Sequence, residues 1–247
     1  MMTRNMERAL DRLYNEASWK LNGVLRTSRF FDPKQIVYLY KSKVMSYIEF
    51  RTSAIYHASE AGLRRIDGLQ DRMRSRIGVS EVDAIEVFHL APLRTRRDMA
   101  MLGVIHRAML GLGPDHFRKY FRLAPVVGMP SRTRHSKQIN SHRCGNFLDL
   151  LAYSVLGAAD VYNLLPEYIV KANSTKEFQH RLQELVIVAA NEGLHQWQDL
   201  FSPRQALHAH TVKKWFGWEG CAAPMTNVQN TGVVNNGCVT AWLRFGA

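Results

Sequence analysis

The stretch from Asp32 to Gly78, DPKQIVYLYKSKVMSYIEFRTSAIYHASEAGLRRIDGLQDRMRSRIG, decides the fold because its pattern predicts two consecutive helices. Asp32 followed by Pro33 supplies an N-cap oxygen and a first helical residue with a fixed φ angle. The residues that follow carry a wide apolar stripe at helical spacing, which is typical of a buried helix. The stripe consists of Ile36, Val37, Tyr40, Val44, Tyr47 and Ile48.

The second helix of this stretch has an apolar face and a cationic band beside it. Its apolar face consists of Leu63, Ile66, Leu69, Gln70, Met73 and Ile77. Arg65, Arg72 and Arg76 fall in a narrow band about 100° away from that face. The pattern therefore predicts a helix with its core on one side and cations on the next.

Three segments of the chain together resemble one protein family. The first is residues 39–58 with Leu69-Gln70, Arg72 and Arg76-Ile77-Gly78, the second is Leu93-Arg94-Thr95-Arg96-Arg97, and the third is Tyr162-Asn163-Leu164-Leu165-Pro166 followed by Phe178 and Leu182. In order and spacing they resemble the region after the catalytic palm in reverse transcriptases of non-LTR retrotransposons. Tyr162 stands where that family usually has Trp.

The resemblance covers about residues 1–190 and implies an all-α fold, the thumb and C-terminal connection of an RNA-directed DNA polymerase. We expect an irregular bundle of about six to eight helices. The expected parts are a thumb-like region over 1–121, a basic loop or linker over 122–146, a helical connection over 147–218 and a poorly ordered tail over 219–247. An amphipathic helix from Met6 to Val24 follows the palm in the resembled family, so the chain is expected to be a downstream fragment of a transposable element's polymerase.

The positive charge is concentrated in the first part of the chain. The net charge is +12, and residues 1–150 hold 26 Lys and Arg against 14 Asp and Glu, whereas residues 151–247 hold 7 against 7. Such asymmetry favours a polyanionic partner, because Lys and Arg that neutralise phosphates release condensed counterions. The alternative is a basic surface that only keeps the protein in solution.

Two groups of helical arginines are candidates for contact with phosphates, and a hybrid duplex would be read by backbone and shape. They are Arg65, Arg72 and Arg76 in the second helix and Arg94, Arg96 and Arg97 in the first turn of a helix that Pro92 opens. Three cations at a helix N-terminus oppose the helix dipole. The equally weighted alternative for the second group is ion pairing with Asp98 or with acids of neighbouring helices.

A basic loop supplies the remaining candidates. From Arg118 to Arg143 the chain has seven Lys and Arg residues and no acid. Arg132, Arg134, Lys137 and Arg143 are the candidates for tracking a phosphate backbone, with Ser and Thr hydroxyls beside them. The alternative is a connector that happens to be basic.

The sequence lacks the residues that polymerase catalysis needs. The resembled family holds two metal ions with paired aspartates in a Tyr-x-Asp-Asp strand, and this chain has no Asp-Asp dipeptide. Asp67 and Asp71 lie among arginines and are interpreted as partners in ion pairs within their own helix. No nucleotide-binding, hydrolase or zinc-protease motif is present. We therefore expect no catalytic residue, metal or cofactor, and DNA synthesis by this chain alone is not expected.

Three widely spaced cysteines, Cys144, Cys221 and Cys238, indicate neither a disulfide framework nor a zinc site. His208 with His210, and His135 and His142 with Cys144, are interpreted as surface or core residues instead of metal ligands. No apolar run reaches the roughly 18 residues of a membrane span, so we expect no membrane partner and a nuclear or cytoplasmic location.

These observations predict weak, salt-sensitive binding of an RNA–DNA hybrid or other nucleic acid through its phosphate backbone. A separate polymerase palm and fingers would be a further partner. Two alternatives stay open: a helical protein–protein interaction module, and an inactive remnant of the element.

Overall fold

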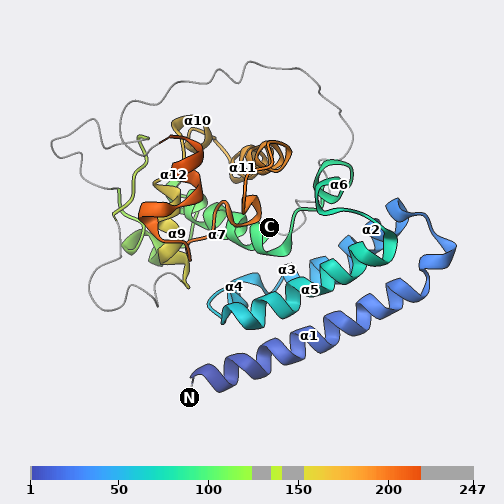
Figure 1. The fold of residues 1–247 in the computed structure, drawn as a ribbon. Coiled ribbons are helices and arrows are strands. Elements are labelled where there is room, and N and C mark those ends of the chain that lie inside the picture. Colours follow the sequence, from blue (N-terminus) through green and yellow to red (C-terminus); the bar gives the residue numbers. More distant parts are fainter. Residues whose placement is uncertain (1, 124–134, 141–152, 218–247) are drawn as a thin grey trace.

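The computed structural model describes residues 2–123, 135–140 and 153–217, and within these ranges the chain is helical and forms no strand (Figure 1). This confirms the predicted all-α class. Six of the described helices, α1, α2, α5, α7, α9 and α11, have eight residues or more. The predicted tail over 219–247 lies outside the described residues.

The elements follow one another along the described chain as short and long helices. The α-helices are α1 (Met2–Arg26), α2 (Pro33–Tyr40), α3 (Ser46–Glu49), α4 (Thr52–Ile55), α5 (Glu60–Ile77), α6 (Glu81–Glu86), α7 (Leu93–Met109), α9 (Val155–Tyr162), α10 (Glu167–Val170), α11 (Thr175–Asn191) and α12 (Thr211–Trp215). One π-helical turn, η2 (Lys41–Met45), joins α2 to α3, and the 3-10 turns are η1 (Ser28–Phe30), η3 (Asp115–Lys119), η6 (Trp197–Asp199) and η7 (Leu207–Ala209).

Helices α1 to α5 form a bundle around one buried cluster. Helices α1 and α5 lie side by side and run in the same direction, and the segment from α2 to α4 returns between them in sequence (Figure 1). Their apolar faces meet in one buried cluster that includes Leu21, Tyr40, Ile66 and Met73. A Cβ added at Gly62 would lie 2.5 Å from Leu10 Cδ1, so this glycine permits the close approach of the two helices.

Local signals set the helix ends in this bundle, and the predicted N-cap at Asp32 is confirmed. Asp32 forms a capping box, accepting from the Gln35 backbone N–H at 2.8 Å while Gln35 Oε1 accepts from the Asp32 N–H at 3.1 Å. Gly78 ends α5 in the left-handed conformation at φ 68°. The first predicted helix is interrupted, because a π-helical turn separates α2 from α3.

The second buried cluster gathers around α7. Helices α9 and α11 pack on α7, and the cluster includes Leu102, Tyr162, Phe178 and Leu200. Leu93 at the start of α7 belongs to the first cluster, so this helix connects the two cores. The predicted domain boundaries at 121, 146 and 218 stay predictions.

Local signals also set the helix ends in this part of the chain. Pro92 is the N-cap residue of α7, and Ser80 Oγ accepts from the Asp83 N–H at 3.0 Å. Ser174 Oγ accepts from the Glu177 N–H at 3.1 Å, and α11 ends at Asn191.

None of the described helices combines the length and the apolar composition needed to cross a bilayer.

Candidate nucleic-acid interface

A groove between α1 and α5 brings two of the predicted phosphate-contacting arginines together. It has a volume of about 530 Å³, opens widely to solvent and is lined by Asn22, Leu25, Arg26, Arg72 and Arg76. The lining includes no carboxylate. Guanidinium groups carry five N–H donors and no acceptor, so the groove presents donors and positive charge to an incoming anion.

The charges of two of these arginines are not neutralised by any described residue of the protein. Arg72 donates to Asn22 Oδ1 at 2.8 Å and holds the two helices together. Arg26 and Arg76 are exposed, and within the described ranges their side chains form no hydrogen bond or ion pair. The groove thus has cationic groups available for a ligand.

The helix dipole explains part of this arrangement. Because α1 and α5 run in parallel, their C-terminal turns lie at the same end, and Arg26 and Arg76 stand in these turns. A cation there is stabilised by the partial negative charge of the helix end by about 0.3–1 kcal/mol. The dipole accounts for their presence at the helix ends but gives their guanidinium donors no partner.

Arg65, the third member of the predicted band, is already paired. It contacts Asp11 Oδ1 at 2.5 Å and stacks over the Tyr14 ring at 4.3 Å from its centroid. The pair is exposed, with 52% of the Arg65 side chain accessible. Exposed ion pairs contribute little stability. Arg65 is not among the residues that line the groove.

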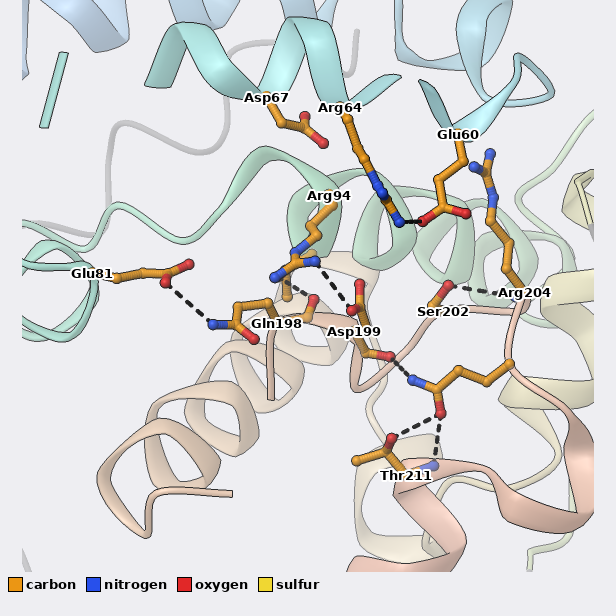
Figure 2. Close-up of polar contacts among 12 residues, drawn as sticks. Glu60, Arg64, Asp67, Glu81, Arg94, Gln198, Asp199, Ser202, Arg204 and Thr211 are labelled. Atoms are coloured by element: carbon orange, nitrogen blue, oxygen red, sulfur yellow. Dashed lines mark hydrogen bonds and ion pairs between the residues drawn. The ribbon is translucent and has the colours of Figure 1, made fainter. Parts of the chain in front are cut away.

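The second predicted group is used inside the protein. Arg97 donates to both carboxylate oxygens of Asp67 at 2.5 and 2.7 Å, and its side chain is 6% exposed. Arg96 is 4% exposed and pairs with Glu49. Arg94 pairs with Asp199 at 3.1 Å (Figure 2). These contacts match the alternative interpretation of this group, ion pairing with acids of neighbouring helices. Arg96 and Arg97 are therefore no longer candidates for phosphate contact, because buried, paired guanidinium groups cannot reach a ligand.

The acidic partners differ from those expected for α5. Asp71 does pair within its helix, with Arg74 at 2.7 Å. The same prediction for Asp67 is wrong, since its carboxylate binds Arg97 on α7. The charged residues on this flank of α5 therefore join helices instead of stabilising only their own.

A polar cleft of about 290 Å³ lies between α5, the start of α7 and residues 196–205. Figure 2 shows side chains of both signs meeting there, Arg94 with Asp199 and Arg64 with Glu60. Outside the lining of the cleft, Gln198 donates a hydrogen bond to Glu81 of α6. The cleft balances its cations with carboxylates. It therefore lacks the excess positive charge of the α1–α5 groove.

Asp98 is the most perturbed carboxyl in this cleft. Burial raises its pKa to about 7, although a 2.8 Å hydrogen bond from the Tyr56 hydroxyl and the nearby Arg97 and Arg204 oppose that change. Arg204 in turn donates to the Tyr56 and Ala58 carbonyls at 2.8 and 3.3 Å. The network links the end of α4 to α7 and to the C-terminal segment, so its evident role is to join the two cores.

Of the predicted basic loop over 122–146, the structure describes residues 122–123 and 135–140. Lys137 Nζ donates to the Val170 carbonyl at 3.1 Å, and Asn163 exchanges two hydrogen bonds with the Ile139 backbone at 2.8 and 2.7 Å. This part is anchored to α9 and α10, and Lys137 has an internal partner. Arg132, Arg134 and Arg143 lie outside the described residues, and their candidate role stays a prediction.

The described histidines are placed without a metal-binding cluster. In the described part of the chain no group of three or more His, Cys, Asp or Glu residues is arranged to hold a metal ion. His210 is buried and bonds the Ser202 carbonyl at 3.0 Å, whereas His208 is exposed. His142 and Cys144 lie outside the described ranges.

Sequence reasoning missed Arg26. It stands four residues beyond Asn22 at the end of α1, and only the parallel packing of α1 on α5 brings it beside Arg72 and Arg76. A cation in the last turn of a helix is so common that its position alone carries no signal for a site.

Comparison with known proteins adds no family to this description. No protein-family model, curated protein or solved structure matches the chain.

Proposed function

We propose that the chain binds nucleic acid through the phosphate backbone, with Arg26, Arg72 and Arg76 of the α1–α5 groove as the contacting residues. The observation that carries the proposal is the groove itself, in which three guanidinium groups from two helices meet without a lining carboxylate. Phosphate contacts by arginine fix position without reading sequence. Binding is therefore non-specific and falls steeply with salt.

The resemblance to the post-palm region of non-LTR reverse transcriptases adds a biological setting to this proposal. The band of Arg65, Arg72 and Arg76 belongs to the segment that carries the resemblance, and two of its members line the groove. In this setting the helices α1 and α5 act as a thumb that contacts the phosphate backbone of the nucleic acid beside a polymerase palm.

The test compares two triple variants of equal charge. Arg26, Arg72 and Arg76 are replaced by Ala in one, and the exposed Arg12, Arg64 and Arg118, which lie outside the groove, are replaced by Ala in the control. Affinity for a labelled RNA–DNA hybrid is measured by fluorescence anisotropy at low salt. We expect the groove variant to lose about 10- to 100-fold in affinity and the control to lose much less, because only the first removes phosphate contacts.

Circular dichroism establishes that both variants keep their helices. Equal losses in the two variants would show that only overall charge matters and would contradict the proposed site. No binding by the folded wild-type chain at low salt would contradict the function itself and favour the protein-interaction module or the inactive remnant.

A further inference from the structure

An exposed aromatic residue stands one helical turn beyond the arginine groove. Phe30 belongs to η1, which follows directly on α1. The Thr27 N–H donates to the Val24 carbonyl at 3.2 Å and the Phe30 N–H to the Thr27 carbonyl at 2.9 Å, so the chain continues in helical turns past Arg26. Phe30 therefore lies at the same end of the α1–α5 pair as the groove.

The Phe30 ring is presented to solvent and is held in a cationic setting. It is 69% exposed, and the adjacent Phe31 is 42% exposed. The Arg29 guanidinium lies 4.7 Å from the Phe30 ring centroid, which is cation–π distance. A ligand that covers the exposed ring would gain the stabilisation that burial of a phenyl group gives.

A nucleobase is the ligand that fits both features. Bases stack on aromatic side chains with a stabilisation of about 1–3 kcal/mol each, irrespective of sequence. Within a duplex the bases already stack on one another and offer no face to an outside ring except at the ends. An unpaired strand that lays its phosphates in the groove has free bases to stack one turn away.

We propose that Phe30 is a stacking platform for an unpaired base, so that the groove prefers single-stranded nucleic acid over a duplex. This inference rests on the proposed function, since it requires the strand's phosphates to bind Arg26, Arg72 and Arg76. It adds to that function a preference for single-stranded nucleic acid and names Phe30 as the residue that provides it.

The experiment uses Phe30→Ala and a matched control, Phe50→Ala. Phe50 is also a phenylalanine with an adjacent arginine, Arg51, at 6.0 Å from its ring centroid, and its exposure of 70% equals that of Phe30 within one percentage point. It follows α3, away from the lining of the groove. The full chain and both variants are titrated into a labelled 12-nucleotide RNA and into the same RNA paired with complementary DNA.

We expect wild type to bind the single strand more tightly than the hybrid. Phe30→Ala should weaken single-strand binding about 5- to 150-fold, the range that corresponds to loss of one stacked base. Hybrid binding by this variant, and both affinities of Phe50→Ala, should stay within about twofold of wild type.

Two results would overturn the inference while leaving phosphate binding intact: unchanged single-strand affinity in Phe30→Ala, or equal losses for single strand and hybrid. A wild type that binds the hybrid more tightly than the single strand would also overturn it. Absence of binding to either probe by the wild type is a different outcome, because it contradicts the proposed function as well.

Discussion

At the scale of single residues, burial decides what each arginine of this chain does. Arg97 is enclosed and forms two bonds with Asp67, whereas Arg76 is exposed and has no partner among the described residues. One arginine thus joins two helices through an ion pair, and the other is a cation without a partner among the described residues. Both are arginines in helices with other arginines close by in the sequence, so the sequence around them does not distinguish their roles. The difference comes from the residues that surround each side chain in the folded protein.

Replacement of Asp67 by Ala should destabilise the protein strongly. The change leaves the Arg97 guanidinium buried without its counter-charge, and loss of one partner of a buried pair costs about 3–5 kcal/mol. The matched control is Asp71→Ala in the same helix, whose ion pair with Arg74 is largely exposed on the acidic side and should cost under about 1 kcal/mol. Urea denaturation measures both, and equal costs would contradict the structural role of the Arg97–Asp67 pair.

Asp98 should make stability depend on pH with a definite sign. Its pKa is raised from the ordinary value of 3.8 to about 7 by burial. Between these values the folded state binds the proton and the unfolded state does not, so the free energy of unfolding falls as pH rises through this window. The carboxyl is faced by Tyr56, Arg97, Arg204 and Asp199.

The measurement is the difference in unfolding free energy between wild type and Asp98→Asn at several pH values. Relative to the variant, wild type should lose roughly 2–4 kcal/mol from pH 4 to pH 7 and change little above it. Taking the difference cancels other groups, such as His106, whose pKa burial lowers to about 4. A difference that is flat with pH, or that rises, would contradict the assignment to Asp98.

At the scale of elements, two glycines of α5 should respond in opposite directions to the same substitution. Gly78 ends the helix at φ 68°, where a Cβ is strained, so Gly78→Ala should cost about 1–2 kcal/mol. Gly68 lies inside the helix and an added Cβ meets nothing within 4 Å, so Gly68→Ala should stabilise by about 1 kcal/mol. Thermal and urea unfolding compare the two, and changes of the same sign would contradict the described end of α5.

Helix ends and apolar faces could be predicted from the sequence because their causes are local. Asp32, Gly78 and Ser174 act on backbone groups within a few residues, and each caps the helix beside it. The partners of Arg96 and Arg97 could not be predicted from the sequence, because Glu49 and Asp67 are 47 and 30 residues away in the chain. The candidate groove could be predicted only in part. Arg72 and Arg76 share a helix, so the sequence pattern places them together, whereas Arg26 comes beside them only because α1 packs on α5.

At the scale of the whole molecule, two helical cores are joined by a polar network while a groove on the first core faces solvent. The net charge of +12 is partly consumed in ion pairs such as Arg97–Asp67 and Arg94–Asp199. At the α1–α5 groove, Arg26 and Arg76 hold charge that no described residue neutralises and that is available to a partner. The molecule thus separates cations that hold it together from cations that are available for phosphate.

The salt dependence of hybrid binding tests this central claim most directly, because its slope counts phosphate contacts. The logarithm of the binding constant is measured against the logarithm of salt concentration for wild type, for the groove variant without Arg26, Arg72 and Arg76, and for the control without Arg12, Arg64 and Arg118. The account predicts that the slope of the groove variant is smaller by about three, one for each lost contact, and that the control keeps the wild-type slope. A groove variant with the wild-type slope, or a control that loses as much as the groove variant, would contradict it.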